Sequence, residues 1–188
     1  DRDDGDDNGG TAAADTLLGN SSRNDLRGGG GDDTLVDSGG VPGWESKDKF
    51  KGGEGNDQMF GESGIDTVSG GAGNDTIVGG DSADILSGED GNDTIFGGNQ
   101  FGALDNGGDI IDGGDGDDQL FGEAGNDTIT GGTGQDNMQG QDGNDTMTGG
   151  GGSDSMNGGI GNDILTAQAG NDSLVGDAGR DTLIGGRG

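Results

Sequence analysis

The stretch Gly113–Asn157 reads GGDGDDQLF GEAGNDTIT GGTGQDNMQ GQDGNDTMT GGGGSDSMN, five units of nine residues with no residue lost or gained between them. In each unit the first and fourth residues are Gly, the sixth is Asp and the eighth is large and apolar. A helix or hairpin of a globular domain has no reason to repeat every nine residues. A chain that coils, with one turn and one short strand per unit, does repeat in this way.

The same frame extends over most of the chain. Insertions are needed at 37–42 and, inside the unit that begins at Gly97, at 100–106. We therefore expect an acidic lead-in or degenerate half-turn at 1–9 and one array at 10–188, degenerate over 10–51 and regular over 52–188. Because the chain starts at Asp1 and stops inside a unit, we expect it to be part of a longer protein. The units begin at Gly10, Gly19, Gly28, Gly43, Gly52, Gly61, Gly70, Gly79, Gly88, Gly97, Gly113, Gly122, Gly131, Gly140, Gly149, Gly158, Ala167 and Gly176.

Two places in the unit test this frame. The sixth place is Asp in every unit except one, where it is Asn24. The eighth place is large and apolar in every unit, although only 24% of the chain is hydrophobic. Generic low complexity does not give this regularity, so we predict that the eighth place faces the interior. Its residues are Leu17, Leu26, Leu35, Phe50, Met59, Val68, Ile77, Leu86, Ile95, Ile111, Leu120, Ile129, Met138, Met147, Met156, Leu165, Leu174 and Leu183.

The residue types within a unit predict the local structure. Glycines at the first, second and fourth places permit a tight turn with positive φ. The seventh to ninth places, such as Thr76-Ile77-Val78, are β-formers that alternate in direction. Two units would close one coil, and strands would stack in parallel about 4.8 Å apart. We therefore predict an all-β fold, a right-handed parallel β-roll (two-sheet β-solenoid) with two nonapeptides per coil and about nine coils.

The composition narrows the classes of partner. The chain has 38 acidic and 8 basic residues, a formal net charge of −30, and neither Cys nor His. Composition alone is typical of an acidic disordered chain, and only the periodicity argues for a fold. The charge argues against nucleic acid or an anionic membrane surface as partner and favours cations. Thiolate sites, disulfides and the common zinc sites are excluded, and no apolar run is long enough for a membrane span.

The turn sequence GGxGxD predicts binding of a hard cation. Each turn offers backbone carbonyls and one carboxylate, and calcium prefers six to eight oxygen ligands at roughly 2.3–2.6 Å. One turn cannot supply that number but two stacked turns can, so each site is expected between unit n and unit n+2. Magnesium fits poorly because it demands tight octahedral geometry and retains water. The alternative, solvated loop acids without metal, is disfavoured because the stacked carboxylates would repel one another.

The predicted ligands follow from this arrangement. On one edge they are Asp57, Asp75, Asp93, Asp118, Asp136, Asp154 and Asp172, and on the other edge Asp66, Asp84, Asp109, Asp127, Asp145, Asp163 and Asp181. Asp33 is a further predicted carboxylate ligand. The predicted carbonyl ligands include those of Gly52, Glu54, Asn56, Gly70, Ala72, Asn74, Gly113, Asp115, Gly131, Thr133, Gly149 and Gly151.

The pattern resembles the RTX family of glycine- and aspartate-rich nonapeptide proteins, which bacterial type I secretion exports. Complete copies of the motif include GGEGND (Gly52–Asp57), GGAGND (Gly70–Asp75) and GGTGQD (Gly131–Asp136). The resemblance implies a parallel β-roll with calcium in its turns, disordered without calcium and folded outside the cell. It covers 28–188 closely and 10–27 loosely.

Some turns depart from the motif. GTAAAD (Gly10–Asp15), GNSSRN (Gly19–Asn24) and GWESKD (Gly43–Asp48) lack the inner glycines, so we expect their sites to be weak or empty. GGDSAD (Gly79–Asp84) has Ser82 in place of Gly, and the unit at Gly97 is split by its insertion. Counting neighbouring complete turns gives an expectation of about ten calcium ions per chain.

The ninth place is predicted to face outward, and it differs between the two sheets. On one sheet it reads Leu18, Val36, Phe60, Val78, Phe96, Phe121, Gln139, Asn157 and Val175; on the other it is almost entirely polar. We expect an exposed apolar stripe from Leu18 to Phe121 that is covered by a protein partner, a neighbouring domain or another copy. Ordinary β-propensity is the alternative, but it would not select one sheet.

The expected function is that of a calcium-binding module and not of an enzyme, because the paired carboxylates all belong to turns and no nucleophile–base pair is recognisable. We expect a structural or adhesive module of a secreted bacterial surface, sheath or matrix protein. The alternative is the C-terminal secretion and folding module of an exported protease, lipase, epimerase or cytolysin. In either case calcium outside the cell would supply the free energy of folding.

Overall fold

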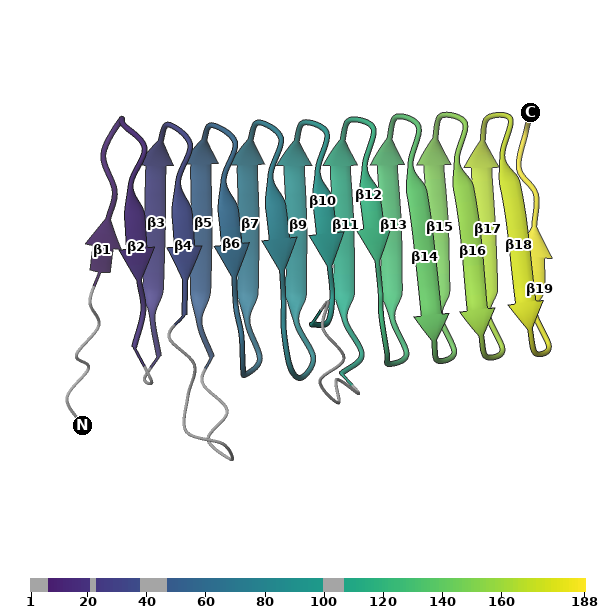
Figure 1. Cartoon of the computed structure of the whole chain (residues 1–188). Helices are drawn as coiled ribbons and strands as arrows, with labels where there is room; N and C mark the ends of the chain where they lie inside the picture. The colour runs from purple at the N-terminus through teal and green to yellow at the C-terminus, as the bar shows by residue number, and fades with distance from the viewer. Residues whose placement is uncertain (1–6, 21–22, 38–46, 100–106) are drawn as a thin grey trace.

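The computed structural model describes residues 7–20, 23–37, 47–99 and 107–188, which form nineteen β-strands and no helix. The strands build two parallel sheets that lie face to face as a flattened rod, with the chain winding from one end to the other (Figure 1). The predicted all-β, two-sheet parallel solenoid is therefore confirmed. Among the described residues there is accordingly no helical segment that could cross a membrane.

Odd-numbered and even-numbered strands form separate sheets. Sheet A contains β1 (Asp7–Gly9), β3 (Asp25–Gly30), β5 (Lys49–Glu54), β7 (Thr67–Ala72), β9 (Ile85–Asp90), β11 (Ile110–Asp115), β13 (Thr128–Thr133), β15 (Thr146–Gly151), β17 (Ile164–Ala169) and β19 (Thr182–Ile184). Sheet B contains β2 (Thr16–Leu18), β4 (Thr34–Val36), β6 (Gln58–Phe60), β8 (Thr76–Val78), β10 (Thr94–Phe96), β12 (Gln119–Phe121), β14 (Asn137–Asp142), β16 (Ser155–Ile160) and β18 (Ser173–Ala178).

The strands pair in a register set by the repeat. Each strand lies beside the strand one coil later, so that equivalent places of the unit are neighbours, as in Ile111↔Ile129 and Ile129↔Met147. The turns that lead from sheet A to sheet B form one edge of the rod, the first edge. The turns that lead back from sheet B to sheet A form the second edge.

The core is one apolar residue per strand. Eighth-place side chains from Leu26 to Leu165 are buried between the sheets, and Leu17 and Leu174 pack partly buried against them. Leu183, in the last strand, is 46% exposed because no further coil covers it. The interior is therefore a thin double row of apolar side chains, as the sequence predicts.

The strands are longer than the three residues that the sequence indicates. In sheet A most of them run through the seventh to ninth places and on into the first three places of the next unit. Gly132, for example, pairs with Gly150 within β13 and β15. Glycine permits this because a backbone without Cβ can lie against the next coil while φ is positive. In sheet B the strands before β14 have three residues and those from β14 on have six.

Both insertions belong to the second edge, between β4 and β5 and between β10 and β11. Most of 37–42 and all of 100–106, with Trp44 and Phe101, lie outside the described residues. Asp37 is described, and its N–H donates to the Phe60 carbonyl 3.0 Å away. This is the pairing that Gly19 and Gly61 make with Val36 and Val78, so Asp37 takes the first place of its turn.

Candidate metal centre

Sixth-place side chains form a continuous row along each edge of the rod. The backbone N–H of each one donates to Oδ1 of the aspartate one coil later, over 2.5–3.1 Å. On the first edge the row runs from Asp15 to Asp172, and on the second from Asn24 to Asp181. The fifteen aspartates predicted as ligands all lie in these two rows, divided between the edges as the sequence indicates.

The second carboxylate oxygen of these aspartates is buried and receives no hydrogen bond in most of the turns. This holds for Oδ2 of Asp33, Asp48, Asp57, Asp66, Asp75, Asp93, Asp118, Asp136, Asp145, Asp154 and Asp163. Asp84, Asp109 and Asp127 occupy the same rows. A buried carboxylate oxygen without a donor is costly unless a cation or a proton accompanies it. Regular repetition of such an atom over eleven turns therefore indicates cation binding.

In the regular turns the first-place residue beside that oxygen is glycine, except for Ala167 in the unit of Asp172. A Cβ on Gly131 would collide with Asp136 Oδ2 and with the carbonyl oxygen of Gly149 in the next coil. The same pair of contacts recurs at Gly52 with Asp57 and the Gly70 carbonyl. In these turns the carboxylate oxygen and the first-place carbonyl oxygen thus both lie close to the glycine, and we call the position between them, where a Cβ would stand, the hollow of the turn. Gly131 has no positive φ, so space and not backbone conformation requires glycine here.

The predicted carbonyl ligands at the first and third places of the unit have different neighbours. First-place carbonyls, those of Gly70 and Gly149 for example, border the hollows just described. Third-place carbonyls are already hydrogen-bonded: Ala72 O accepts from Gly55 N–H and Thr133 O from Gly116 N–H, each at 2.8 Å. A carbonyl oxygen has two lone pairs, so each of these can still coordinate a cation, but with one pair only. A first-place carbonyl can also accept a backbone hydrogen bond, as Gly97 O does from Gly80 N–H at 2.9 Å, so what distinguishes this set is its closeness to the sixth-place carboxylates.

Burial between coils raises the pKa of several sixth-place aspartates in the middle of the two rows. Desolvation is the main cause and neighbouring carboxylates add to it, while the backbone N–H donor opposes it. The pKa of Asp66 and Asp93 is raised to about 7, and that of Asp75, Asp136 and Asp145 to about 6. Without a cation, these five carboxyl groups would therefore be partly protonated in the fold at pH 6–7.

The structure adds one carboxylate that the sequence pattern passed over. Asp48 belongs to the turn GWESKD, which lacks the inner glycines. Its side chain is nevertheless buried, its Oδ1 accepts from Asn24 N–H at 2.5 Å, and its Oδ2 has no hydrogen bond, as in the regular turns. Asp48 stands at the sixth place of its unit, and this position in the repeat is the sequence signal that would have predicted it as a ligand.

A second side-chain row runs in the opposite direction and was not predicted. At the fifth place, a side-chain oxygen accepts from the backbone N–H one coil later, as in Asn74 N–H to Asn56 Oδ1 and Asn92 N–H to Asn74 Oδ1, both 2.8 Å. On the second edge Asn144 and Asn162 continue the same pattern. Each turn is thus tied to both neighbours through side chains, which explains why the fifth place is so often Asn.

No three acidic side chains converge on one point among the described residues. A site here would combine two carboxylates from successive turns with backbone carbonyls. An all-oxygen set of this kind suits a hard cation that tolerates irregular geometry, which is the preference of calcium. The residues present therefore fit calcium.

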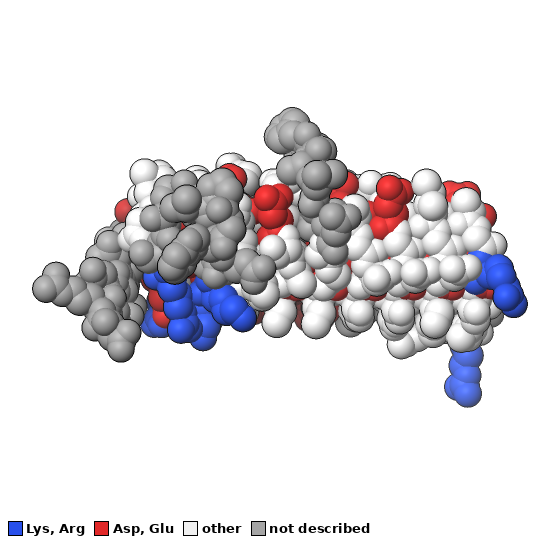
Figure 2. Space-filling model, turned by 90° about the horizontal axis from the view of Figure 1, so that it is seen from below, with Lys and Arg blue, Asp and Glu red and all other residues white. Residues whose placement is uncertain are grey.

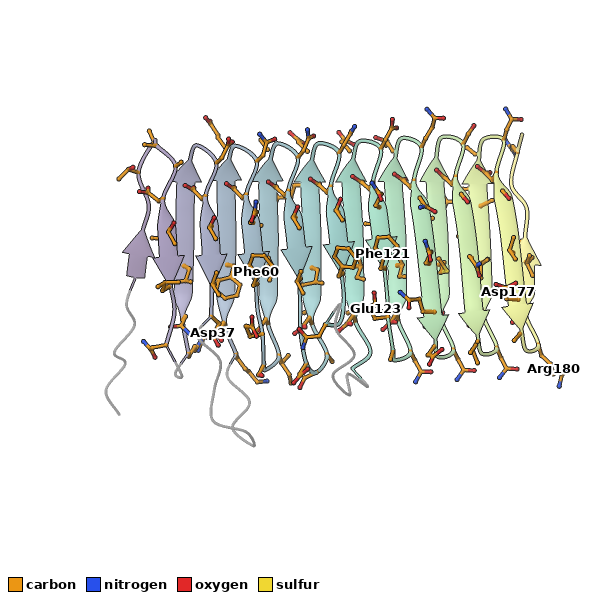
Figure 3. The ribbon with its side chains drawn as sticks, in the orientation of Figure 1. Asp37, Phe60, Phe121, Glu123, Asp177 and Arg180 are labelled. Carbon is orange, nitrogen blue, oxygen red and sulfur yellow. The ribbon has the colours of Figure 1, made fainter. Side chains whose placement is uncertain are left out.

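The predicted apolar stripe lies on the outer face of sheet B, where Phe60 and Phe121 project from β6 and β12 (Figure 3). Its residues partly cover one another along the ladder. The rings of Phe96 and Phe121 stack with centroids 4.8 Å apart, Val78 is only 7% exposed, and Leu18 at the end is 64% exposed. Contacts between ninth-place side chains of successive coils thus bury part of the apolar surface of this face.

Comparison with known families gives one match. The profile described as "RTX calcium-binding nonapeptide repeat (4 copies)" matches residues 9–36, 46–68, 69–102, 105–138, 130–165 and 157–188. These segments cover most of the chain and leave out 1–8, 37–45 and 103–104, of which 37–45 contains the first insertion. No curated protein matches the sequence.

Filling one hollow should impair one site. We expect Gly131→Ala to weaken calcium binding and to lower the free energy of unfolding in calcium by about 1–3 kcal/mol, because the methyl group overpacks the space beside Asp136 Oδ2. Calorimetric titration and urea unfolding would measure both. Gly151→Ala is the matched control, since its Cβ would meet nothing within 4 Å and its φ is not positive. Equal effects of the two substitutions would contradict this assignment.

Protonation of sixth-place aspartates at acidic pH should partly substitute for calcium in stabilising the fold. Because the folded-state pKa of these aspartates is raised above 3.8, protonation stabilises the calcium-free fold, and this contribution is lost as pH rises through about 6–7. Calcium-free protein should therefore show more β-structure by circular dichroism at pH 5 than at pH 8. With saturating calcium the difference should disappear. More structure at pH 8 in the calcium-free sample would refute this.

Proposed function

Because the chain belongs to the RTX calcium-binding nonapeptide repeat family, we propose that it is a calcium-dependent β-roll whose two rows of turns bind about ten ions and that serves as a structural or adhesive module of a secreted protein. The family and the β-roll are established above. The number of ions, the adhesive role and the extracellular location belong to the proposal.

One observation carries the calcium part of the proposal: the rows of buried Asp Oδ2 atoms that receive no hydrogen bond. Each row places like charges one strand spacing apart, roughly 4.8 Å, where their repulsion opposes folding. A divalent cation between successive turns would compensate both the charge and the missing donor. The ligands would be sixth-place carboxylates, Asp48 included, together with first-place carbonyls such as those of Gly70 and Gly149.

The consequence is a chain whose folding depends on calcium concentration. Its apolar interior is only one residue wide per strand, and its net charge is −30. Where calcium is scarce, the chain would stay extended, which suits export. In the millimolar calcium found outside cells, binding would supply the free energy of folding. A long, regular array of this kind suits a load-bearing or surface-covering role.

A second function is equally compatible with the repeat. The same module could be the calcium-dependent secretion and folding part of an exported enzyme or toxin whose catalytic domain lies elsewhere in a longer chain. No catalytic role is proposed for the residues described above.

The apolar stripe on sheet B is proposed as a contact surface for a protein partner or a second copy. Its support is its confinement to one sheet, from Leu18 to Phe121, whereas the ninth place on sheet A is polar. The stacking of Phe96 on Phe121 reduces the exposed area without removing it.

Calcium dependence can be tested by circular dichroism of the full chain. A β-signal should appear on adding calcium and disappear with chelator. Asp136→Asn should shift the calcium midpoint upward, because the amide can still accept from Asp118 N–H but carries no charge. Asp112→Asn, at an exposed place of β11, changes the net charge equally and should leave the midpoint near that of the wild type. A β-signal that chelator does not affect would refute the proposal.

Self-association through the stripe can be tested by sedimentation velocity in calcium. The wild-type chain should associate as its concentration rises, and Phe60→Ser should reduce that association because it removes an apolar anchor. Thr128→Ser, at an exposed place of sheet A, is the control. A wild-type monomer at every concentration would exclude a second copy as the partner.

A further inference from the structure

The first turn on each edge differs from most of the regular turns in how its sixth-place side chain is satisfied. On the first edge, Asp15 Oδ2 accepts from Thr11 N–H at 2.7 Å and from the Thr11 hydroxyl at 2.9 Å. From Asp33 onward the equivalent oxygen receives no hydrogen bond in most turns. In this turn the chain itself supplies hydrogen-bond donors to the carboxylate oxygen, in the place where a regular turn would need a cation.

On the second edge, the first turn carries an amide in place of a carboxylate. Asn24 is 2% exposed, and its Nδ2 donates to the Asn20 carbonyl at 2.9 Å, to Asp37 Oδ1 at 3.1 Å and to Asp48 Oδ1 at 3.2 Å. Its own Oδ1 accepts from Asn20 N–H at 3.0 Å. The reverse orientation of the amide would place its oxygen against three other oxygens, so the network fixes the side chain.

The amide occupies the position that the hollow has in regular turns. A Cβ on Gly19 would lie 2.9 Å from Asn24 Nδ2 and 2.9 Å from Asp37 Oδ1. In a regular turn the corresponding neighbours of the first-place glycine are a carboxylate oxygen and a first-place carbonyl of the next coil. The NH₂ group, with its two polarised hydrogens, thus stands among oxygens where later turns have room for a cation.

Positive charge on the surface is concentrated at the same end. Five of the eight basic residues lie exposed on β3 and β5 or directly before them, and Figure 2 shows Lys and Arg gathered at the N-terminal end. They are Arg23, Arg27, Lys47, Lys49 and Lys51. Arg27 also forms an ion pair with Asp25 at 2.9 Å. The repulsion that calcium would relieve elsewhere is therefore lower in the first coils.

We propose that the first coils, β2 to β5, form a cap that needs fewer calcium ions than the later coils, because Thr11 and Asn24 replace the cations of the first turn on each edge, while Asp33 and Asp48 keep the open oxygens of regular turns. In a solenoid each coil contacts only its neighbours, so a preformed end provides a template on which the next coil can add. Calcium-driven folding would then proceed from the N-terminal end. This inference rests on the proposed function in that the later turns are taken to need calcium.

Hydrogen–deuterium exchange of the full chain tests the cap directly. In calcium-free buffer, amides of β3 and β5 should exchange more slowly than those of β13 to β17, and with calcium all of them should be protected. Protection of the whole chain without calcium would refute the proposed function. Protection of no segment without calcium, followed by protection of all segments with it, would refute the cap and leave the proposed function intact.

Asn24→Asp separates the roles of the amide and the turn. It removes the donor and adds a third carboxylate, so calcium-free protection of β3 and β5 should be lost. In saturating calcium the variant should fold and bind one more ion than the wild type, as measured by calorimetric titration. Asn137→Asp, at an exposed place of β14, is the control with the same charge change and should alter neither quantity. Retained calcium-free protection, or failure to fold in calcium, would overturn the role assigned to Asn24.

Discussion

The fold depends on how the hydrogen bonding and the charge of buried carboxylates, stacked one coil apart, are satisfied. A parallel solenoid places every sixth-place aspartate directly over the equivalent one, at the spacing of neighbouring strands. One oxygen of each is used to bind the backbone N–H of the preceding coil, which ties the coils together. In eleven of these turns, from Asp33 to Asp163, the other oxygen is buried and receives no hydrogen bond. The same side chains are therefore both the link between coils and the main source of repulsion within the fold.

Everything else in the repeat is compatible with this constraint. The first-place glycine leaves the hollow open, because any Cβ there would fill it. The fifth-place side chains bind the next coil in the opposite direction, so that each turn is held from both sides. The core contributes one apolar residue per strand. So thin an interior gives little hydrophobic stabilisation for a chain of this charge, and this supports the proposal that cation binding contributes to folding.

The N-terminal end relieves the constraint differently. There the chain places donors of its own, the Thr11 hydroxyl and the Asn24 amide, against the carboxylates. Irregular units of a repeat protein are readily dismissed as decayed copies. In this chain the departures GTAAAD and GNSSRN coincide with two turns whose sixth-place side chains receive or donate hydrogen bonds within their own turn.

The sequence by itself determined the period, the direction of each strand residue and the division of the aspartates between two edges. These follow from spacing alone, because a nine-residue unit with one inward apolar residue admits few ways to coil. Only the tertiary structure decided what each turn oxygen contacts. Asp37 and Asp48, although an insertion lies between them, both take part in the regular hydrogen bonding between coils. Third-place carbonyls accept backbone hydrogen bonds, and the Asn24 amide lies among carboxylates. Those outcomes depend on which atoms of separate coils meet, and the identity of a residue within its own unit does not specify its neighbours one coil away.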